Sequence, residues 1–190
     1  MMKQEEILEI FKKSGALLEG HFKLTSGLHS SQYVEKFQVL QWPKYTEILC
    51  KEIAKRFKND AIQVVVGPVT GGILLAHEVA KELGTRAIFT EREEGRMTLR
   101  RGFEIKPGEK VLIVEDIITT GGSVVEVIGV VKAHKGSLAG VGLLVDRSNN
   151  KVDFGVRKEA LATLDIKSYA PEKCPMCEKG IPITKRGSRK

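Results

Sequence analysis

Short apolar runs alternate with amphipathic segments through the middle of the chain. Continuous Val, Ile and Leu runs are typical of strands covered on both faces of a sheet, and apolar residues at helical spacing indicate helices. The pattern predicts strands at 62–66, 86–89, 111–115, 138–145 and 162–166 and helices at 43–57, 73–83 and 124–135. This order predicts a doubly wound α/β fold, with a mostly parallel sheet and helices on both faces.

The N-terminal part has a less regular pattern. Residues 4–13 predict a short helix with Ile7, Leu8 and Phe11 on one face, and SSQYVEKFQVL (30–40) is the best strand candidate before Trp42. We therefore expect three parts: an N-terminal unit at 1–42, a core at 43–170 and a basic C-terminal tail at 171–190.

Length and composition are those of an ordinary globular domain. The chain has 190 residues, of which 42% are hydrophobic and 29% charged. No apolar run approaches the roughly 20 residues that cross a bilayer, and the N-terminus lacks a signal-peptide core, so we expect a cytoplasmic protein and no membrane partner. The net charge of +7 suits a polyanionic small substrate, but equally a nucleic acid or an unremarkable solvated surface.

The most informative stretch is VLIVEDIITTGGSVVEVI, at 111–128. A buried strand ends in Glu115 and Asp116, and a turn rich in glycine and hydroxyl groups then opens a helix. Backbone N–H groups at such a helix start, with the hydroxyls, can bind a phosphate monoester. We expect this cradle to comprise Thr119, Thr120, Gly121, Gly122 and Ser123. A plain tight turn is the alternative, and the spacing is not that of a Walker A loop.

The two acids add to the phosphate-binding interpretation. Carboxylates accept hydrogen bonds from vicinal hydroxyls, as the acid of dinucleotide folds does for a ribose. A ligand whose phosphate lies on the cradle would hold its middle over Glu115 and Asp116. A ribose 5-phosphate group satisfies both demands.

The stretch VLIVEDIITTGGS resembles the phosphoribosyl-diphosphate signature of the type I phosphoribosyltransferases. The resemblance implies their fold, their reaction, a Mg²⁺ cofactor and a homodimer, with Glu115 and Asp116 acting on the ribose. It also implies that the turn in VVVGPVTGGILLA binds the donor's diphosphate, through Thr70, Gly71 and Gly72 with Gly67. Taken alone, that turn could be a simple connection.

A polar stretch, TEREEGRMTLRRG (90–102), lies between two predicted strands. We interpret it as a mobile lid whose arginines meet the diphosphate leaving group: Arg96 as a catalytic residue, Arg92 and Arg100 as binding residues, and Arg101 beside them. A solvated hairpin with surface charges is the alternative.

The segments FKLTSGLHSSQYVEKFQVL and LLVDRSN resemble the orotate branch of the family. The resemblance implies that residues 1–42 form a hood over the base site, with Lys23 and Tyr33 as binding residues. Arg147, after the strand that follows the cradle helix, would recognise orotate, because a guanidinium fork matches a carboxylate or imide edge. A surface ion pair with Asp146 is the alternative for Arg147.

The sequence departs from that branch at several positions. Gly71 and Thr25 stand where many orotate enzymes carry lysines, the lid has arginines in place of lysines and a histidine, and the first acid is Glu115. Two other functions therefore stay open: a purine phosphoribosyltransferase, and a regulator that senses the donor and binds nucleic acid. We expect small-molecule substrates and no nucleic-acid partner, because no winged or helix-turn-helix pattern is found.

Cys174 and Cys177 form a CPMC motif near the C-terminus. One such motif supplies two metal ligands, and His21, His29, His77 and His134 show no metal-binding spacing. We therefore assign no metal-ligating residues. A zinc half-site completed by a second chain and a redox pair are alternatives to the expected solvated extension, whose basic residues include Lys185, Arg186, Arg189 and Lys190.

Overall fold

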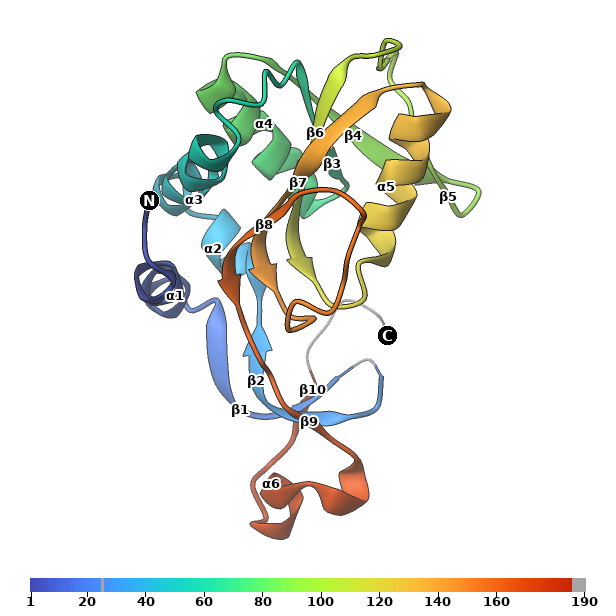
Figure 1. Cartoon of the computed structure of the whole chain (residues 1–190). Helices are drawn as coiled ribbons and strands as arrows, with labels where there is room; N and C mark the ends of the chain where they lie inside the picture. The colour runs from blue at the N-terminus through green and yellow to red at the C-terminus, as the bar shows by residue number, and fades with distance from the viewer. Residues whose placement is uncertain (25, 186–190) are drawn as a thin grey trace.

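The computed structural model describes residues 1–24 and 26–185 and contains a six-stranded and a four-stranded sheet (Figure 1). Thr25, Arg186, Arg189 and Lys190 lie outside the described residues. The large sheet contains β3 (Val64–Pro68), β4 (Arg86–Glu93), β5 (Arg96–Leu99), β6 (Lys110–Ile118), β7 (Ser137–Asp146) and β8 (Lys158–Thr163), in the order β5-β4-β3-β6-β7-β8. All pairs are parallel except β4 with β5, so the predicted fold class is confirmed.

Helices cover both faces of this sheet (Figure 1). On one face, α1 (Gln4–Lys13), α3 (Pro43–Arg56) and α4 (Gly71–Leu83) pack over Val65, Leu112 and Val114. On the other face, α5 (Gly122–Ala133) packs over the alternate residues Val64, Val66 and Ile113. Because side chains alternate across a strand, the continuous apolar runs supply both cores.

The strand order reverses between β3 and β6. From β3 the chain moves outward to β4 and then returns to place β6 on the opposite side of β3. The connections that follow β3 and β6 diverge to opposite faces of the sheet, which leaves a crevice at the carboxyl ends of these strands. Both turns that the sequence singles out, after Pro68 and after Ile118, begin at this crevice.

Local sequence explains the helix ends. Pro43 occupies the first turn of α3, where its missing N–H has no partner in any case. Gly84 ends α4 with φ of +68°, a left-handed conformation that glycine adopts without strain.

The small sheet is assembled from both ends of the chain. Its strands are β1 (Leu17–Lys23), β2 (His29–Val34), β9 (Ser168–Tyr169) and β10 (Thr184–Lys185), in the order β10-β1-β2-β9. We call it the hood sheet. Strand β1 was not predicted, and the prediction of one strand over 30–40 is only half correct, because α2 (Lys36–Leu40) replaces its second half. Val39 and Leu40 of α2 are buried in the main core, a tertiary contact that alternation along the sequence does not reveal.

The segment between β9 and β10 contains η1 (Pro171–Lys173) and α6 (Pro175–Glu178) and lies beyond the hood sheet, at the end of the molecule away from the large sheet (Figure 1). Cys174 and Met176 are buried. Most other described residues of 171–185 are exposed, so the predicted solvated extension needs only one correction: two buried side chains anchor it to the hood. Within the described residues, we find no helix with the length and apolarity needed to cross a membrane.

Candidate active site

The cradle is the turn from β6 into α5. Gly121 has φ of +74°, and a Cβ there would lie 2.9 Å from Phe154 Cε1 and Val152 Cγ1, so only glycine fits. The first turn of α5 contains no acidic residue, and exposed residues of the turn present N–H and hydroxyl groups: Thr119, Thr120, Gly122 and Ser123. The positive end of the helix dipole is thus open to an anion.

A cleft of about 250 Å³ lies over this turn. It is lined by the whole cradle, by Glu115 from β6 and by Arg92 from β4. The structure therefore brings together the predicted phosphate cradle, one predicted acid and one predicted arginine. Such convergence of polar groups in a cleft is the usual mark of a ligand site.

Glu115 and Asp116 are 8% and 1% exposed, respectively, at the end of β6. The Asp116 N–H donates to Glu115 Oε1 at 2.9 Å, and the Ile117 N–H donates to Asp116 Oδ1 at 2.7 Å. These backbone bonds fix both carboxyl groups at the crevice.

Lys36, which sequence analysis missed, is the cation that meets the acids. Its Nζ donates to Asp116 Oδ1 at 3.0 Å and lies 2.8 Å from Oδ2. Burial lowers the pKa of Lys36, but the charge of Asp116 and the hydrogen bond to it outweigh burial, so the pKa is raised. Lys36 begins α2, immediately after the hood strands, and thereby links the hood to the core.

The two acids do not carry equal charge. Burial, and then the neighbouring charge of Asp116, raise the pKa of Glu115 from its ordinary 4.5 to about 8. Burial also raises the pKa of Asp116, while Lys36 opposes that shift. Glu115 therefore holds its proton to a higher pH than an ordinary carboxyl group, and the ion pair with Lys36 favours negative charge on Asp116.

The predicted diphosphate turn packs directly against Asp116. A Cβ on Gly71 would lie 1.9 Å from Asp116 Oδ2, and a Cβ on Gly67 would lie 2.1 Å from the Gly72 carbonyl oxygen. Both positions thus require glycine for close packing. Thr70 is exposed at the start of α4, whose first N–H groups lack intrahelical partners, so this turn also offers donors to an anion.

The predicted lid is the β4–β5 hairpin, at the edge of the large sheet (Figure 1). Its arginines pair with glutamates: Arg92 with Glu126 at 2.7 Å, Arg100 with Glu93 at 3.3 Å and Arg101 with Glu91 at 2.9 Å. Of these, Arg92 lines the cleft, whereas Arg96 is exposed beside α5 and does not line it. In this conformation the hairpin resembles the solvated alternative more than a closed lid.

Arg147 follows β7 at the same edge of the sheet. Asp146 does not pair with it, because Lys158 Nζ lies 2.7 Å from Asp146 Oδ2 and Ser148 donates to Oδ1 through both its N–H and its hydroxyl. Arg147 Nε is buried and has no hydrogen-bond partner among the described residues. Burial lowers the pKa of Arg147, and Tyr33 of β2 lies close enough to oppose that shift.

Lys23, the other predicted hood residue, is exposed at the end of β1 and pairs in the sheet with His29. Among the described residues, no hydrogen bond or ion pair connects it with Arg147 or the acids. The Arg147 N–H donates to the Ile118 carbonyl oxygen at 2.9 Å, so Arg147 lies next to the end of β6. A half-buried guanidinium with an unpartnered Nε near a tyrosine is suited to a planar anionic ligand.

Comparison with known proteins agrees with this geometry. Residues 38–154 match the model of the family described as "Phosphoribosyl transferase domain". The chain is 59% identical over 189 residues to an orotate phosphoribosyltransferase of Pelotomaculum thermopropionicum, covering 100% of both chains, and 58% identical over 188 residues to that of Desulforamulus reducens, covering 99% and 98%. The crystal structure of orotate phosphoribosyltransferase from Aeropyrum pernix superimposes with a TM-score of 0.69 at 27% identity, over 83% of this chain and 93% of that one.

Proposed function

The chain belongs to the phosphoribosyltransferase family, and from this premise we propose how its residues carry out the reaction of the orotate branch. That reaction transfers the 5-phosphoribosyl group of 5-phosphoribosyl 1-diphosphate to orotate and gives orotidine 5′-phosphate and diphosphate, a step of pyrimidine biosynthesis. The observation that supports this division of roles most directly is the position of the cradle beside the acid pair at the strand-order switch.

The donor lies across the crevice with its 5′-phosphate on the cradle. The exposed hydroxyls and N–H groups of Thr119–Ser123 bind this phosphate, and Glu115 and Asp116 bind the ribose hydroxyls. The diphosphate lies over the turn at Thr70–Gly72, next to Asp116. Arg92 lines the cleft over the cradle, and movement of the hairpin would bring it, with Arg96 and Arg100, to the diphosphate.

Breaking the bond between C1 and diphosphate makes the sugar resemble an oxocarbenium ion. Negative charge on Asp116 stabilises this developing positive charge, and cationic and N–H groups stabilise the departing diphosphate. Alignment of the two substrates supplies much of the remaining rate enhancement. No covalent bond to the enzyme is needed.

Lys36 has a separate role in this proposal. Many orotate enzymes carry a lysine in the diphosphate turn, but here the space beside Gly71 is filled by the Asp116 carboxylate. Lys36 brings a positive charge to the same carboxylate from α2. We therefore assign to Lys36 the task of holding Asp116 ionised and oriented.

Arg147 recognises orotate. Its Nε is buried and unpartnered, which costs free energy of desolvation unless a ligand accepts its hydrogen bond. A carboxylate or imide edge can accept from the guanidinium bidentately. Tyr33 of the hood strand β2 interacts electrostatically with Arg147, so the hood lies close to this guanidinium. The full-length relatives named above favour orotate over a purine base, and over a regulator that binds nucleic acid.

Magnesium is the proposed cofactor. The side chains near the diphosphate turn offer oxygen donors, from Asp116, Glu115 and Thr70, which fit a hard ion that binds mostly through water and substrate phosphates. When bound, the ion neutralises charge on the diphosphate. We also propose a homodimer, which light scattering of the purified protein tests. The proposed location is the cytoplasm, which cell fractionation tests.

The experiment that tests the base pocket is Arg147→Ala. We expect kcat/KM for orotate to fall about 10- to 100-fold, the range of a lost hydrogen bond to a charged group, while the Kd for 5-phosphoribosyl 1-diphosphate changes less than about twofold. Arg147→Lys keeps the charge but loses the fork, so it should recover only part of the activity. Steady-state kinetics and calorimetric titration of the donor provide both readouts.

A collapse of donor binding in Arg147→Ala would contradict the assignment of this pocket to the base. Assays of the wild-type protein with orotate, adenine, hypoxanthine and xanthine complete the test. Turnover with a purine and none with orotate would contradict the proposed acceptor.

A further inference from the structure

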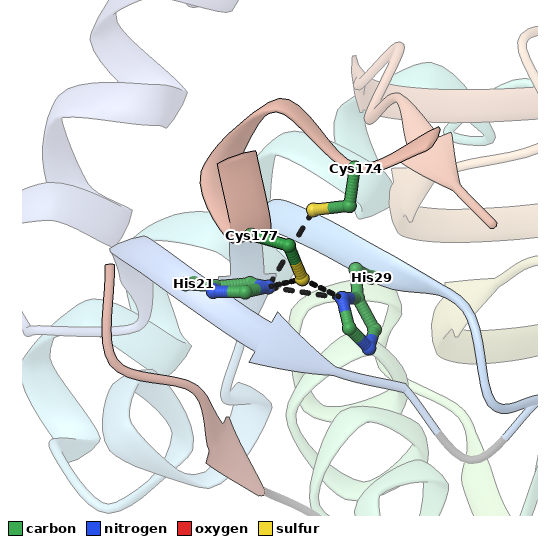
Figure 2. Close-up of side chains that lie close together, drawn as sticks. All are labelled: His21, His29, Cys174 and Cys177. Atoms are coloured by element: carbon green, nitrogen blue, oxygen red, sulfur yellow. Dashed lines mark hydrogen bonds between the residues drawn. The ribbon is translucent and has the colours of Figure 1, made fainter. Parts of the chain in front are cut away.

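Two histidines and two cysteines converge between the hood sheet and the segment that follows it (Figure 2). His21 lies on β1 and His29 on β2, whereas Cys174 precedes α6 and Cys177 lies within it. One ligand atom of each residue lies within 4.8 Å of all the others. The CPMC motif marks two of these residues in the sequence, but not their histidine partners, because 153 positions separate His21 from Cys174.

The distances fit a single tetrahedral metal ion. Zinc bonds of about 2.3 Å to sulfur and about 2.0–2.1 Å to nitrogen place neighbouring S and N ligands roughly 3.6 Å apart and two N ligands roughly 3.3 Å apart. Here His21 Nε2 lies 3.5 Å from Cys174 Sγ and 3.7 Å from Cys177 Sγ, and His29 Nδ1 lies 3.3 Å from Cys177 Sγ. The two imidazole nitrogens are 3.0 Å apart.

The surroundings prepare His21 for ligation. Its Nδ1 lies 2.8 Å from the Ile181 carbonyl oxygen, which can only accept, so Nδ1 carries the proton and Nε2 turns its lone pair toward the cysteines. A metal-bound histidine typically makes this kind of outer hydrogen bond. His21, His29 and Cys174 are 3%, 6% and 1% exposed, and Cys177 is exposed enough to give an ion access from solvent.

We propose that His21 Nε2, His29 Nδ1, Cys174 Sγ and Cys177 Sγ bind one zinc ion within a single chain. A tetrahedral set of two sulfurs and two nitrogens selects zinc among common divalent ions. Since the protein supplies all four ligands, the site is closed and structural. It needs no second chain, unlike a four-sulfur site shared between two CPMC motifs.

The ion would fasten the C-terminal segment to the hood. Strands β9 and β10 have two residues each, and such short ladders hold weakly by themselves. A metal between β1, β2 and the α6 segment would lock all of them together, as structural zinc does in small units with little core. The inference does not depend on the proposed reaction.

Metal content of the untagged wild-type protein is the first test. We expect about one zinc ion per chain by inductively coupled plasma mass spectrometry. The zinc content should fall at least tenfold in Cys174→Ser and in His29→Ala. Cys50→Ala and His77→Ala, a free cysteine and an exposed histidine outside the cluster, should keep the ion. No bound metal after incubation with zinc, iron in place of zinc, or one ion per two chains would each overturn the proposal.

Spectroscopy and unfolding of the wild-type chain give readouts that do not require the variants to fold. Cobalt(II) exchanged into the site should show thiolate charge-transfer and tetrahedral d–d absorption. Chelation should increase hydrogen exchange at residues 17–34 and 168–185 and leave β6 and β7 protected. A disulfide redox pair would give a different result. The protein, kept without reductant, would then have Cys50 as its only free thiol, bind no metal and show the same hydrogen exchange with and without chelator, and this result would reject the zinc site.

Discussion

The cradle with its acids and the histidine–cysteine cluster are two sites built in opposite ways. The first is one continuous stretch, from Glu115 to Ser123, at the junction of a strand and the helix after it. The second draws its four members from β1, β2 and the α6 segment (Figure 2). A local site forms as soon as its strand and helix pack, whereas a dispersed site forms only after both ends of the chain have met.

Their chemistry differs in the same way. In the cradle region, burial and neighbouring charges set the protonation of Glu115 and the ion pair of Asp116, so this region stabilises charge. In the hood, the four ligands converge from separate elements, so that region joins segments of the chain. Changes to the first region should therefore affect turnover more than folding, and changes to the second should do the reverse.

The largest effect on turnover is expected from Asp116→Asn. The amide keeps the shape but removes the negative charge opposite the developing oxocarbenium ion, so kcat/KM should fall about 100-fold or more. Steady-state assays with orotate and donor measure it. Asp165→Asn, at an exposed aspartate that does not line the cleft, is the matched control and should keep full activity.

A midpoint of urea unfolding close to the wild-type value would show that Asp116→Asn acts on chemistry. If activity stayed within a few fold of the wild type, the acid pair would not be the ribose site, and the contrast between the two regions would fail.

A smaller loss is expected from Lys36→Met. Without its hydrogen-bonded cation, Asp116 has a higher pKa and a less fixed orientation, and we expect kcat/KM to fall about 10-fold. The loss should be greatest at low pH, where Asp116 would take up a proton. Pre-steady-state or steady-state rates across pH measure this.

Lys44→Met changes an exposed lysine at the start of α3 and controls for general charge effects. An equal loss of activity at every pH would mean that Lys36 does not hold Asp116 ionised.

The smallest effect concerns folding stability and Glu115. Between pH 4.5 and about 8 the native state keeps a proton on Glu115 that the unfolded chain has released, so the free energy of unfolding falls as pH rises through this window. Glu115→Gln removes this contribution. The difference in free energy of unfolding between wild type and variant should change by about 1 kcal/mol or more between pH 4.5 and about 8. Urea unfolding at a series of pH values measures it.

Chelator offers a cross-check between the two regions. It should lower the stability of both proteins but leave the pH-dependent difference between them unchanged, because Glu115 and the cluster lie in different parts of the fold. A difference curve that changed with chelator would show that the regions are coupled.

Sequence reasoning predicted the central strands and the helices of the large sheet well, because those strands are continuous apolar runs and the helices have clear periodicity. It missed β5, which lies in a polar stretch, and placed the last strand at 162–166, where β8 ends at Thr163. It also placed Glu115, Asp116, the turn after them and Arg147 at the carboxyl ends of the strands, where the structure has them, since each lies at the end of a predicted strand. Their roles stay a prediction. It placed Arg96 in the site from the interpretation of residues 90–102 as a lid, and Lys23 from resemblance. No contact with the crevice residues supports either position in the described chain.

The misses have a common cause. Strand β1, helix α2 and the α6 segment take their structure from partners far along the chain, such as the burial of Val39 and Leu40 in the main core. Lys36 carried one available signal: it stands in YVEKF, in the hood region that was already assigned to the site. Its pairing with Asp116, 80 positions away, could not be read from that signal.

The sequence by itself determined the main strands and helices of the large sheet, its parallel arrangement and the glycine-rich turn that starts α5, because short-range patterns encode burial, turn geometry and helix starts. Only the tertiary structure decided which cation meets Asp116, which acid keeps its proton and which four ligands converge in the hood. Those outcomes depend on distances and desolvation between segments that the linear order of residues does not contain.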